Sequence, residues 1–315
     1  MVYAFDMKPT GALLSCLLAS AAILASPSPA LASFPGHNGL IAWTRPFFLT
    51  DSEIYVMNPD GTDQHALTDN ASNDADPAWS PDGSQLAFES VTGNAFNLYV
   101  IDADGTGVRQ VTHDTHRTDV QPAWSPDGVR IAFSRQKMDG TGGIWVVHVD
   151  GSKLQRLTGE GNANSRPAWS PDGSTIAFVS DRSGNHDIWL MDRDGSNKRP
   201  LTTTPDVQED NPNWSPDGMK VVFDACPASS FPCPGGSVDY NIFVMDADGT
   251  GLVQLTTSPA IDANPAWSPN GNRIVFRSDA TGNTEIWTMK ADGTELHKRT
   301  AGLAGGVDPD WQPLP

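Results

Sequence analysis

A near-identical phrase, Pro-Ala-Trp-Ser-Pro-Asp-Gly, recurs along this chain and constrains its fold more than any other feature. Its tryptophans are Trp79, Trp124, Trp169, Trp214, Trp267 and Trp311. Their spacing is about 45 residues, and only the Trp214–Trp267 interval is longer, because it carries an insertion around Cys226 and Cys233. A fixed period of this length is typical of propellers and other repeat arrays.

Each repeat contains four short segments that favour β-strands, separated by turn residues. In one complete unit the strands are expected at residues 167–170, 174–180, 187–192 and 198–202. The turns are Pro171-Asp172-Gly173 and Asp194-Gly195, and a polar loop covers residues 181–186. Four antiparallel strands in about 45 residues correspond to one propeller blade. The 29 glycines and 25 prolines also argue against a helical protein.

The two ends of the repeat region complete each other. Residues 39–44 align with second strands, whereas residues 308–313 align with a first strand that no further unit follows. We therefore expect an all-β, six-bladed β-propeller of four-stranded blades. The C-terminal strand should close the ring by joining the N-terminal blade, which leaves no long edge unpaired. A single domain over residues 33–315 follows from this arrangement.

The first 32 residues are typical of a cleavable secretory signal peptide. An uncharged apolar run covers residues 11–25, and Ala30-Leu31-Ala32 provides the small residues that precede a cleavage site. Export predicts a secreted or periplasmic protein. It also predicts a disulfide between Cys226 and Cys233, because an even cysteine pair in an exported chain is commonly oxidised.

The net charge of −18 excludes nucleic acid as a natural partner, because affinity for phosphate backbones depends on clustered Lys and Arg. No stretch of the mature chain is apolar for the roughly 20 residues that a transmembrane helix needs. We expect a monomer whose partner is an envelope or extracellular protein, a peptide or a glycan.

The repeat resembles that of the TolB β-propeller. The resemblance rests on Asp-x-x-Pro-x-Trp-Ser-Pro-Asp-Gly, Ser-Asp-Arg-x-Gly-Asn-x-Asp-Ile-Trp and Leu-Thr, which residues 162–202 match almost throughout. It implies the propeller domain only, because TolB carries an additional α/β domain before its propeller that residues 33–38 cannot supply. The envelope partners of TolB, including a peptidoglycan-associated lipoprotein, are therefore not implied.

Similar repeats occur in two groups of enzymes. Prolyl-oligopeptidase-type enzymes need an α/β-hydrolase domain, and this chain has no Gly-x-Ser-x-Gly. Oligogalacturonate lyases would imply a propeller metal held largely by histidine. His113, His116 and His186 are weak candidates for such a metal site, although solvated loop histidines are commoner. No other cofactor and no catalytic residue are predicted.

Two sets of polar positions precede the repeated tryptophans, and together they form a predicted collar at the mouth of the channel. The first ring, five residues before each tryptophan, is Asp74, Asp119, Asn164, Glu209, Asp262 and Gly306. The second ring, three residues before, is Asp76, Gln121, Arg166, Asn211, Asn264 and Asp308. Variable loops between second and third strands should open on the same face.

Two explanations of the collar remain open. For any single residue, a structural role as acceptor for turn amides is the better one. For the face as a whole, the convergence of polar groups and variable loops favours binding. We therefore predict an exported, non-catalytic binding scaffold for a protein, peptide or glycan. The alternative is a metal-dependent carbohydrate lyase or hydrolase with a His/Asp site at the channel mouth.

Overall fold

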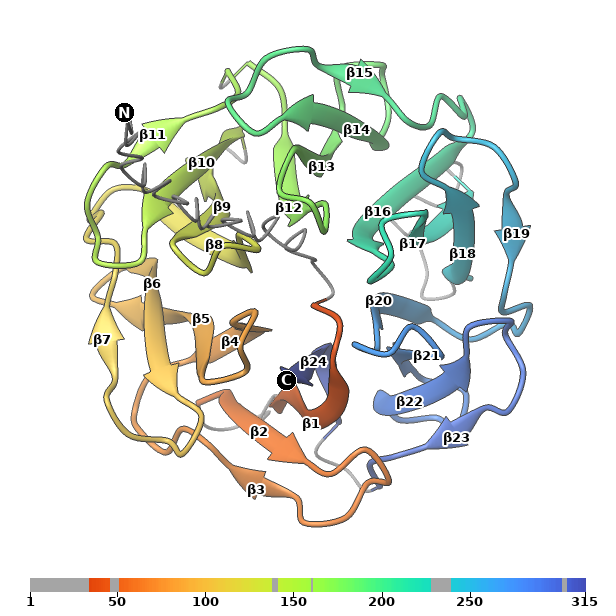
Figure 1. Cartoon of the computed structure of the whole chain (residues 1–315), viewed down its shortest axis with the longest axis horizontal. Coiled ribbons are helices and arrows are strands. Elements are labelled where there is room, and N and C mark those ends of the chain that lie inside the picture. Colours follow the sequence, from red (N-terminus) through yellow and green to blue (C-terminus); the bar gives the residue numbers. More distant parts are fainter. Residues whose placement is uncertain (1–33, 46–50, 138–140, 160, 228–238, 302–304) are drawn as a thin grey trace, which may run out of the picture.

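The computed structural model describes residues 34–45, 51–137, 141–159, 161–227, 239–301 and 305–315. Within these ranges the chain forms six antiparallel sheets of four strands each and contains no helix. The sheets stand around a central axis like the blades of a propeller (Figure 1). The predicted all-β, six-bladed architecture is confirmed.

In every blade the first strand lies at the channel, and the second, third and fourth strands follow outward. Blade 1 comprises β24 (Val307–Leu314), β1 (His37–Arg45), β2 (Glu53–Met57) and β3 (His65–Ala66), and blade 2 comprises β4 (Asp74–Trp79), β5 (Gln85–Thr92), β6 (Ala95–Asp102) and β7 (Arg109–Gln110). Blade 3 comprises β8 (Thr118–Trp124), β9 (Arg130–Gln136), β10 (Gly142–His148) and β11 (Gln155–Arg156), and blade 4 comprises β12 (Asn164–Trp169), β13 (Thr175–Ser180), β14 (Asp187–Asp192) and β15 (Arg199–Pro200). Blade 5 comprises β16 (Val207–Trp214), β17 (Lys220–Pro227), β18 (Asn241–Asp246) and β19 (Val253–Gln254), and blade 6 comprises β20 (Asp262–Trp267), β21 (Arg273–Ser278), β22 (Glu285–Lys290) and β23 (His297–Lys298).

The ring closes between the two ends of the chain, as the repeat pattern predicts. Strand β24 pairs antiparallel with β1, so that Trp311 lies opposite Ile41 and Asp310 lies opposite Ala42. The two strands meet beside the channel (Figure 1). Blade 1 therefore has its first strand from the C-terminus and its other three from the N-terminus, which removes an open sheet edge at the channel.

The hydrophobic core consists of separate clusters between neighbouring blades. In one of them, Trp169 of blade 4 packs with Ile144 and Val146 of blade 3. In another, Trp311 of blade 1 packs with Val275 and Ile286 of blade 6. All six repeated tryptophans are at most 5% exposed. The repeated tryptophan therefore joins each blade to the one before it, which explains its fixed position.

Several predictions from the sequence concern residues that the structure does not describe. The expected signal peptide, residues 1–32, lies outside the described residues, and so does Cys233. Its predicted partner, Cys226, is buried near the end of β17. The disulfide and the cleavage site therefore stay predictions. Among the described residues, no helix is long and apolar enough to cross a membrane.

Candidate functional site in the central channel

A β-bulge in the first strand of every blade turns the second ring toward the channel. In β4, for example, the register shifts between Ala75 and Ala78. The residue inside each bulge has a left-handed backbone, with φ of 49° at Asp76, 57° at Gln121, 53° at Arg166, 54° at Asn211, 53° at Asn264 and 51° at Asp308. Such values are uncommon for residues other than glycine. The chain adopts them at all six positions of the second ring.

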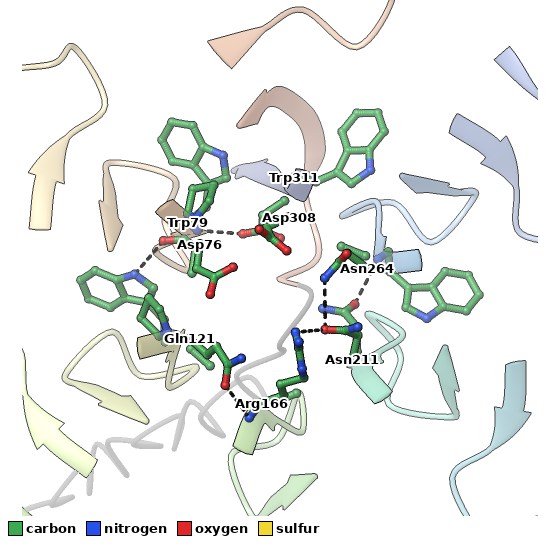
Figure 2. Close-up of a pocket in the computed structure, with 18 of the residues that line it drawn as sticks. Asp76, Trp79, Gln121, Arg166, Asn211, Asn264, Asp308 and Trp311 are labelled. Carbon is green, nitrogen blue, oxygen red and sulfur yellow. Dashed lines mark hydrogen bonds between the residues drawn. The ribbon is translucent and has the colours of Figure 1, made fainter. Parts of the chain in front are cut away.

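All six second-ring residues line one cavity of about 200 Å³ in the channel. Their side chains are half-buried, and the proline and tryptophan of the Pro-x-Trp step that follows each of them form the apolar part of the wall. Phe34 also lines this cavity. Figure 2 shows Asp76 and Asp308 together on one side of the channel and Arg166 on the opposite side.

The first ring does not line this cavity. All six of its residues are buried, and its polar side chains receive hydrogen bonds within and between the blades. Arg135 donates to both carboxylate oxygens of Asp119 at 2.6 and 2.7 Å. Arg182 and Ser180 donate to Asn164, and Thr202 of blade 4 donates to Glu209 of blade 5. Asn70 donates to Asp74 and Ser258 to Asp262. These contacts support the structural explanation for the first ring.

One half of the channel wall is acidic. Burial and the negative charge of Glu89 raise the pKa of Asp76 to about 7. Burial and the charge of Asp76 raise the pKa of Asp308 to about 8. Burial also raises the pKa of Glu89 to about 7, because it outweighs the hydrogen bond from the Gln121 amide. These carboxyl groups therefore change their charge near neutral pH.

The other half of the wall is amide-rich and contains one cation. The guanidinium of Arg166 donates to Asn211, and Asn264 donates to the same Asn211 oxygen at 3.2 Å. Arg166 Nε lies 3.5 Å from Asp210. Burial alone would lower the pKa of Arg166, but Asp210 and the other nearby carboxylates raise it, so that it stays charged. These contacts hold the positive charge opposite Asp76 and Asp308 (Figure 2).

In several blades the backbone amide of the second-ring residue donates a hydrogen bond to a side chain on the second strand of the preceding blade. Sequence reasoning missed this contact. The amide of Asp76 donates to Thr44 at 3.1 Å, and that of Gln121 donates to Glu89 at 3.0 Å. The amide of Asn264 donates to Asp224 at 2.7 Å. Burial raises the pKa of Asp224 to about 7. The available signal was a polar residue directly after the aromatic residue of the second strand, within an otherwise apolar run.

The structure does not bring the three candidate metal ligands together into a metal site. His113 and His116 are exposed. His186 is instead paired with Asp210, its Nδ1 lying 3.2 Å from the carboxylate, and this hydrogen bond raises the pKa of His186. Among the described residues, no group of three or more His, Cys, Asp or Glu side chains could hold a metal ion.

Relatives identified by sequence share only short stretches with this chain. A TolB homolog from Chlorobium luteolum is 37% identical over 70 residues, which are 22% of this chain and 16% of the homolog. The aligned part thus spans about a sixth of that relative's length. Its activity and partners cannot be transferred from such a match.

Solved structures show the same fold over most of the chain. TolB from Acinetobacter baumannii superposes with a TM-score of 0.75 at 23% identity, covering 90% of this chain and 69% of that one. An oligogalacturonate lyase in complex with manganese has a TM-score of 0.57 at 17% identity, covering 82% and 78%. At these identities the likeness concerns the fold alone.

A family model assigns the chain more specifically. The model described as TolB beta propeller domain matches residues 106–233 and 235–314, which is more than half of the sequence. The matched region runs from blade 2 through blade 6 and into β24. The repeat, the six blades and this match agree, and the chain belongs to the TolB β-propeller domain family.

Proposed function

We propose that this protein is an exported, non-catalytic binding module, and that the second ring holds a segment of a protein, peptide or glycan. The observation that carries the proposal is the six-fold left-handed bulge. Each bulge puts a non-glycine residue in an unfavourable backbone conformation and turns a half-buried polar side chain toward one cavity. Strained positions of this kind concentrate at binding sites, where the surrounding structure maintains them.

The charges of the second ring define the chemistry of the ligand. Asp76 and Asp308 on one side would accept hydrogen bonds from an ammonium, guanidinium or hydroxyl group. Arg166 and Asn211 on the other side would bind a carbonyl or carboxylate oxygen. A peptide segment with a lysine side chain and neighbouring carbonyl groups offers both. TolB-like propellers in general are protein-interaction scaffolds, which makes a protein or peptide the first choice and a glycan the second.

The cellular setting of the proposal follows from the sequence. We infer that residues 1–32 direct export, that Cys226 at the end of β17 forms a disulfide with Cys233, and that the mature monomer works in the periplasm or outside the cell. The net charge of −18 would repel acidic surfaces and attract basic partners. An envelope or extracellular protein with an exposed basic segment fits these conditions.

Binding of a lysine peptide tests the role of the second ring. The probe is a fluorescent, capped peptide with two lysines, compared with the same peptide carrying norleucine. At pH 8.5 we expect Asp308→Asn to weaken binding of the lysine peptide about tenfold, the size of one lost charge-assisted hydrogen bond. Asp248→Asn, an exposed aspartate in the β18–β19 hairpin, is the matched control and should change nothing.

The pH dependence provides an independent check. The affinity should fall as the pH drops from 8.5 to 6, because Asp308 and Asp76, with pKa values of about 8 and 7, become protonated and lose their charge. Equal affinity of the lysine and norleucine peptides, or an equal effect of Asp308→Asn and Asp248→Asn, would count against the proposal.

A further inference from the structure

A cavity of about 460 Å³ lies between blades 1 and 2, apart from the channel. Its described lining residues all fall between Leu67 and Val108, and none of them belongs to the second ring. This stretch contains seven Asp and Glu residues but no Lys, Arg or His. The described wall of the cavity therefore has carboxyl groups but no positive charge of its own.

In blade 3 a guanidinium occupies the corresponding place between the blades. Arg135 of β9 lies opposite Asp119 of β8 in the ladder and donates to both of its carboxylate oxygens at 2.6 and 2.7 Å. The same guanidinium lies 5.5 Å from the centre of the Phe133 ring and 4.9 Å from that of the Trp145 ring. This arginine thus combines an ion pair with cation–π contacts to two aromatic rings.

Blade 4 reaches the same arrangement with an arginine from a different position of the strand. Arg182, which follows β13, donates to the Ser180 hydroxyl at 2.9 Å and to Asn164 of the first ring at 2.7 Å. Its guanidinium lies 5.2 Å from the centre of the Phe178 ring and 4.6 Å from that of the Trp189 ring. Two neighbouring blades therefore place a guanidinium between a first-ring side chain and two aromatic rings.

Blade 2 has the same frame, but the stretch that forms the cavity supplies no arginine. Asp74 of the first ring lies opposite Ser90, which is the same ladder pairing as that of the first-ring residue and serine in blade 4. Phe88 lies opposite Tyr99, and their ring centres are 5.8 Å apart. All four residues line the cavity. The cavity therefore occupies the place that a guanidinium fills in blades 3 and 4.

The carboxyl group of Asp74 lacks a donor for one of its oxygens. Asp74 is 0% exposed, and Asn70 donates to its Oδ2 at 2.7 Å, but its Oδ1 has no hydrogen-bond partner among the described residues. Burial raises the pKa of Asp74, and the nearby Ser90, Asn70 and Thr68 side chains oppose this effect only in part. A buried acceptor without a donor is costly, so a bound cation would stabilise the ionised carboxylate.

From these observations we propose that the cavity between blades 1 and 2 binds the guanidinium group of an arginine side chain from a partner protein. The guanidinium would donate to Asp74 Oδ1 and to the Ser90 hydroxyl, and its plane would lie against the Phe88 and Tyr99 rings. A lysine ammonium fits this frame less well, because it lacks the planar fork of donors.

The edge of the cavity favours an arginine within a polypeptide over the free amino acid. Asp69 and Asn70 line the cavity and are exposed, and Val108 adds an apolar side chain that is 55% exposed. Free arginine would bring its own carboxylate to this acidic edge, whereas an arginine within a chain has uncharged amide groups there.

The test follows Tyr99 by fluorine NMR in the full chain, with 3-fluorotyrosine in place of its four tyrosines. Tyr99→Phe assigns the signal by its disappearance. N-acetylarginine methylamide, its lysine and citrulline counterparts and free arginine are each titrated at pH 7.5 and constant ionic strength. We expect a saturable shift with the capped arginine. The citrulline compound, which has lost the charge, should bind at least about tenfold more weakly, and the lysine compound and free arginine should also bind more weakly.

Three variants decide whether the shift reports the proposed site. Ser90→Arg reproduces the arrangement of blade 3 and should abolish binding, because its own guanidinium would pair with Asp74. Asp74→Asn should weaken the capped arginine at least about tenfold. The matched control is Asp262→Asn, a first-ring carboxylate that also lies opposite a serine but does not line this cavity, and it should bind like the parent protein. Unchanged Tyr55 and Tyr240 signals show that each variant is folded.

The proposal is overturned if the capped arginine gives no saturable shift, if the lysine or citrulline compound binds equally well, or if Ser90→Arg or Asp74→Asn binds as well as the parent protein. Tighter binding of free arginine than of the capped compound would overturn the partner protein as the source. Asp308→Asn in the channel should leave the Tyr99 shift unchanged, so a failure of this proposal and a failure of the channel proposal are distinguishable.

Discussion

At the scale of single residues, equivalent positions of the six blades differ in what they contribute to stability. The first ring is the clearest case, because its members are all buried but, among the described residues, only Asp119 forms an ion pair with an arginine. Both partners are almost inaccessible to water, with Arg135 7% and Asp119 0% exposed. Removing one charge from such a pair leaves the other charge buried without a partner. The resulting loss in the free energy of unfolding is larger than the stability that an exposed ion pair contributes.

We therefore expect Asp119→Asn to lower the free energy of unfolding by about 3 kcal/mol. Asp114, 3.7 Å from Arg135, compensates part of the charge and keeps the loss from being larger. The matched control is Asp246→Asn, which breaks an exposed pair with Lys220 of the same 2.6 Å length and should cost less than about 1 kcal/mol. Urea unfolding measures the loss in both variants. Equal losses would contradict the view that the buried Asp119–Arg135 pair matters more for stability than the exposed pair.

At the scale of elements, the sequence predicted the strands well but not the bulges. Alternating apolar residues and Asp-Gly turns mark the second and third strands, and the expected strand over 187–192 coincides with β14 (Asp187–Asp192). First strands begin earlier than expected, as in β12 (Asn164–Trp169). The two rings stand five and three residues before the tryptophan, so in a regular strand their side chains would share one face. The bulge that contains the second-ring residue breaks this alternation, so the first ring is buried and only the second ring lines the channel cavity.

The strand that closes the ring gives a prediction at the same scale. Trp311→Ala should lower the free energy of unfolding by about 3–5 kcal/mol, because the 3% exposed ring of Trp311 joins β24 to blade 6. Trp287→Ala removes a half-buried tryptophan from β22 and should cost clearly less. Urea unfolding measures the two losses, and hydrogen exchange of the β1 amides should accelerate only in Trp311→Ala. Similar losses in both variants would mean that closure does not depend on this contact.

At the scale of the whole molecule, buried carboxyl groups link stability to pH. Burial and nearby negative charges raise the pKa of Asp308 to about 8 and that of Glu209, with Asp187 beside it, to about 8. A carboxyl group with a raised pKa binds its proton more tightly in the folded state than in the unfolded state. Its contribution to stability is therefore complete at acidic pH and is lost as the pH rises through the folded pKa. His186, whose pKa is raised by Asp210, acts in the same direction.

The exposed aspartates of the hairpin turns act in the opposite direction. Hydrogen bonds from Thr106 lower the pKa of Asp104, for example, so that its contribution is lost only as the pH falls below the usual range of aspartate. The two groups together predict maximal stability at about pH 4, near the pKa of carboxyl groups in the unfolded chain. As the pH rises, each unit by which folding raises the pKa of one carboxyl group lowers the free energy of unfolding by about 1.4 kcal/mol. The melting temperature at pH 8.5 should therefore be lower than at pH 5.5 by at least about 3 °C.

Thermal melts of three proteins test this origin of the pH dependence. Asp308→Asn should melt higher than the parent protein, and by more at pH 8.5 than at pH 5.5, because the amide has no proton to lose as the pH rises. Asp104→Asn should lack the contribution of the ionised turn aspartate at both pH 5.5 and pH 8.5, and should approach the parent only below about pH 4, where Asp104 itself becomes protonated. A parent protein that melts higher at pH 8.5 than at pH 5.5 would show that the channel carboxyl groups are ionised at little cost. The channel would then be open to water and ions, and the affinity of the second ring for a lysine side chain should stay constant between pH 6 and 8.5.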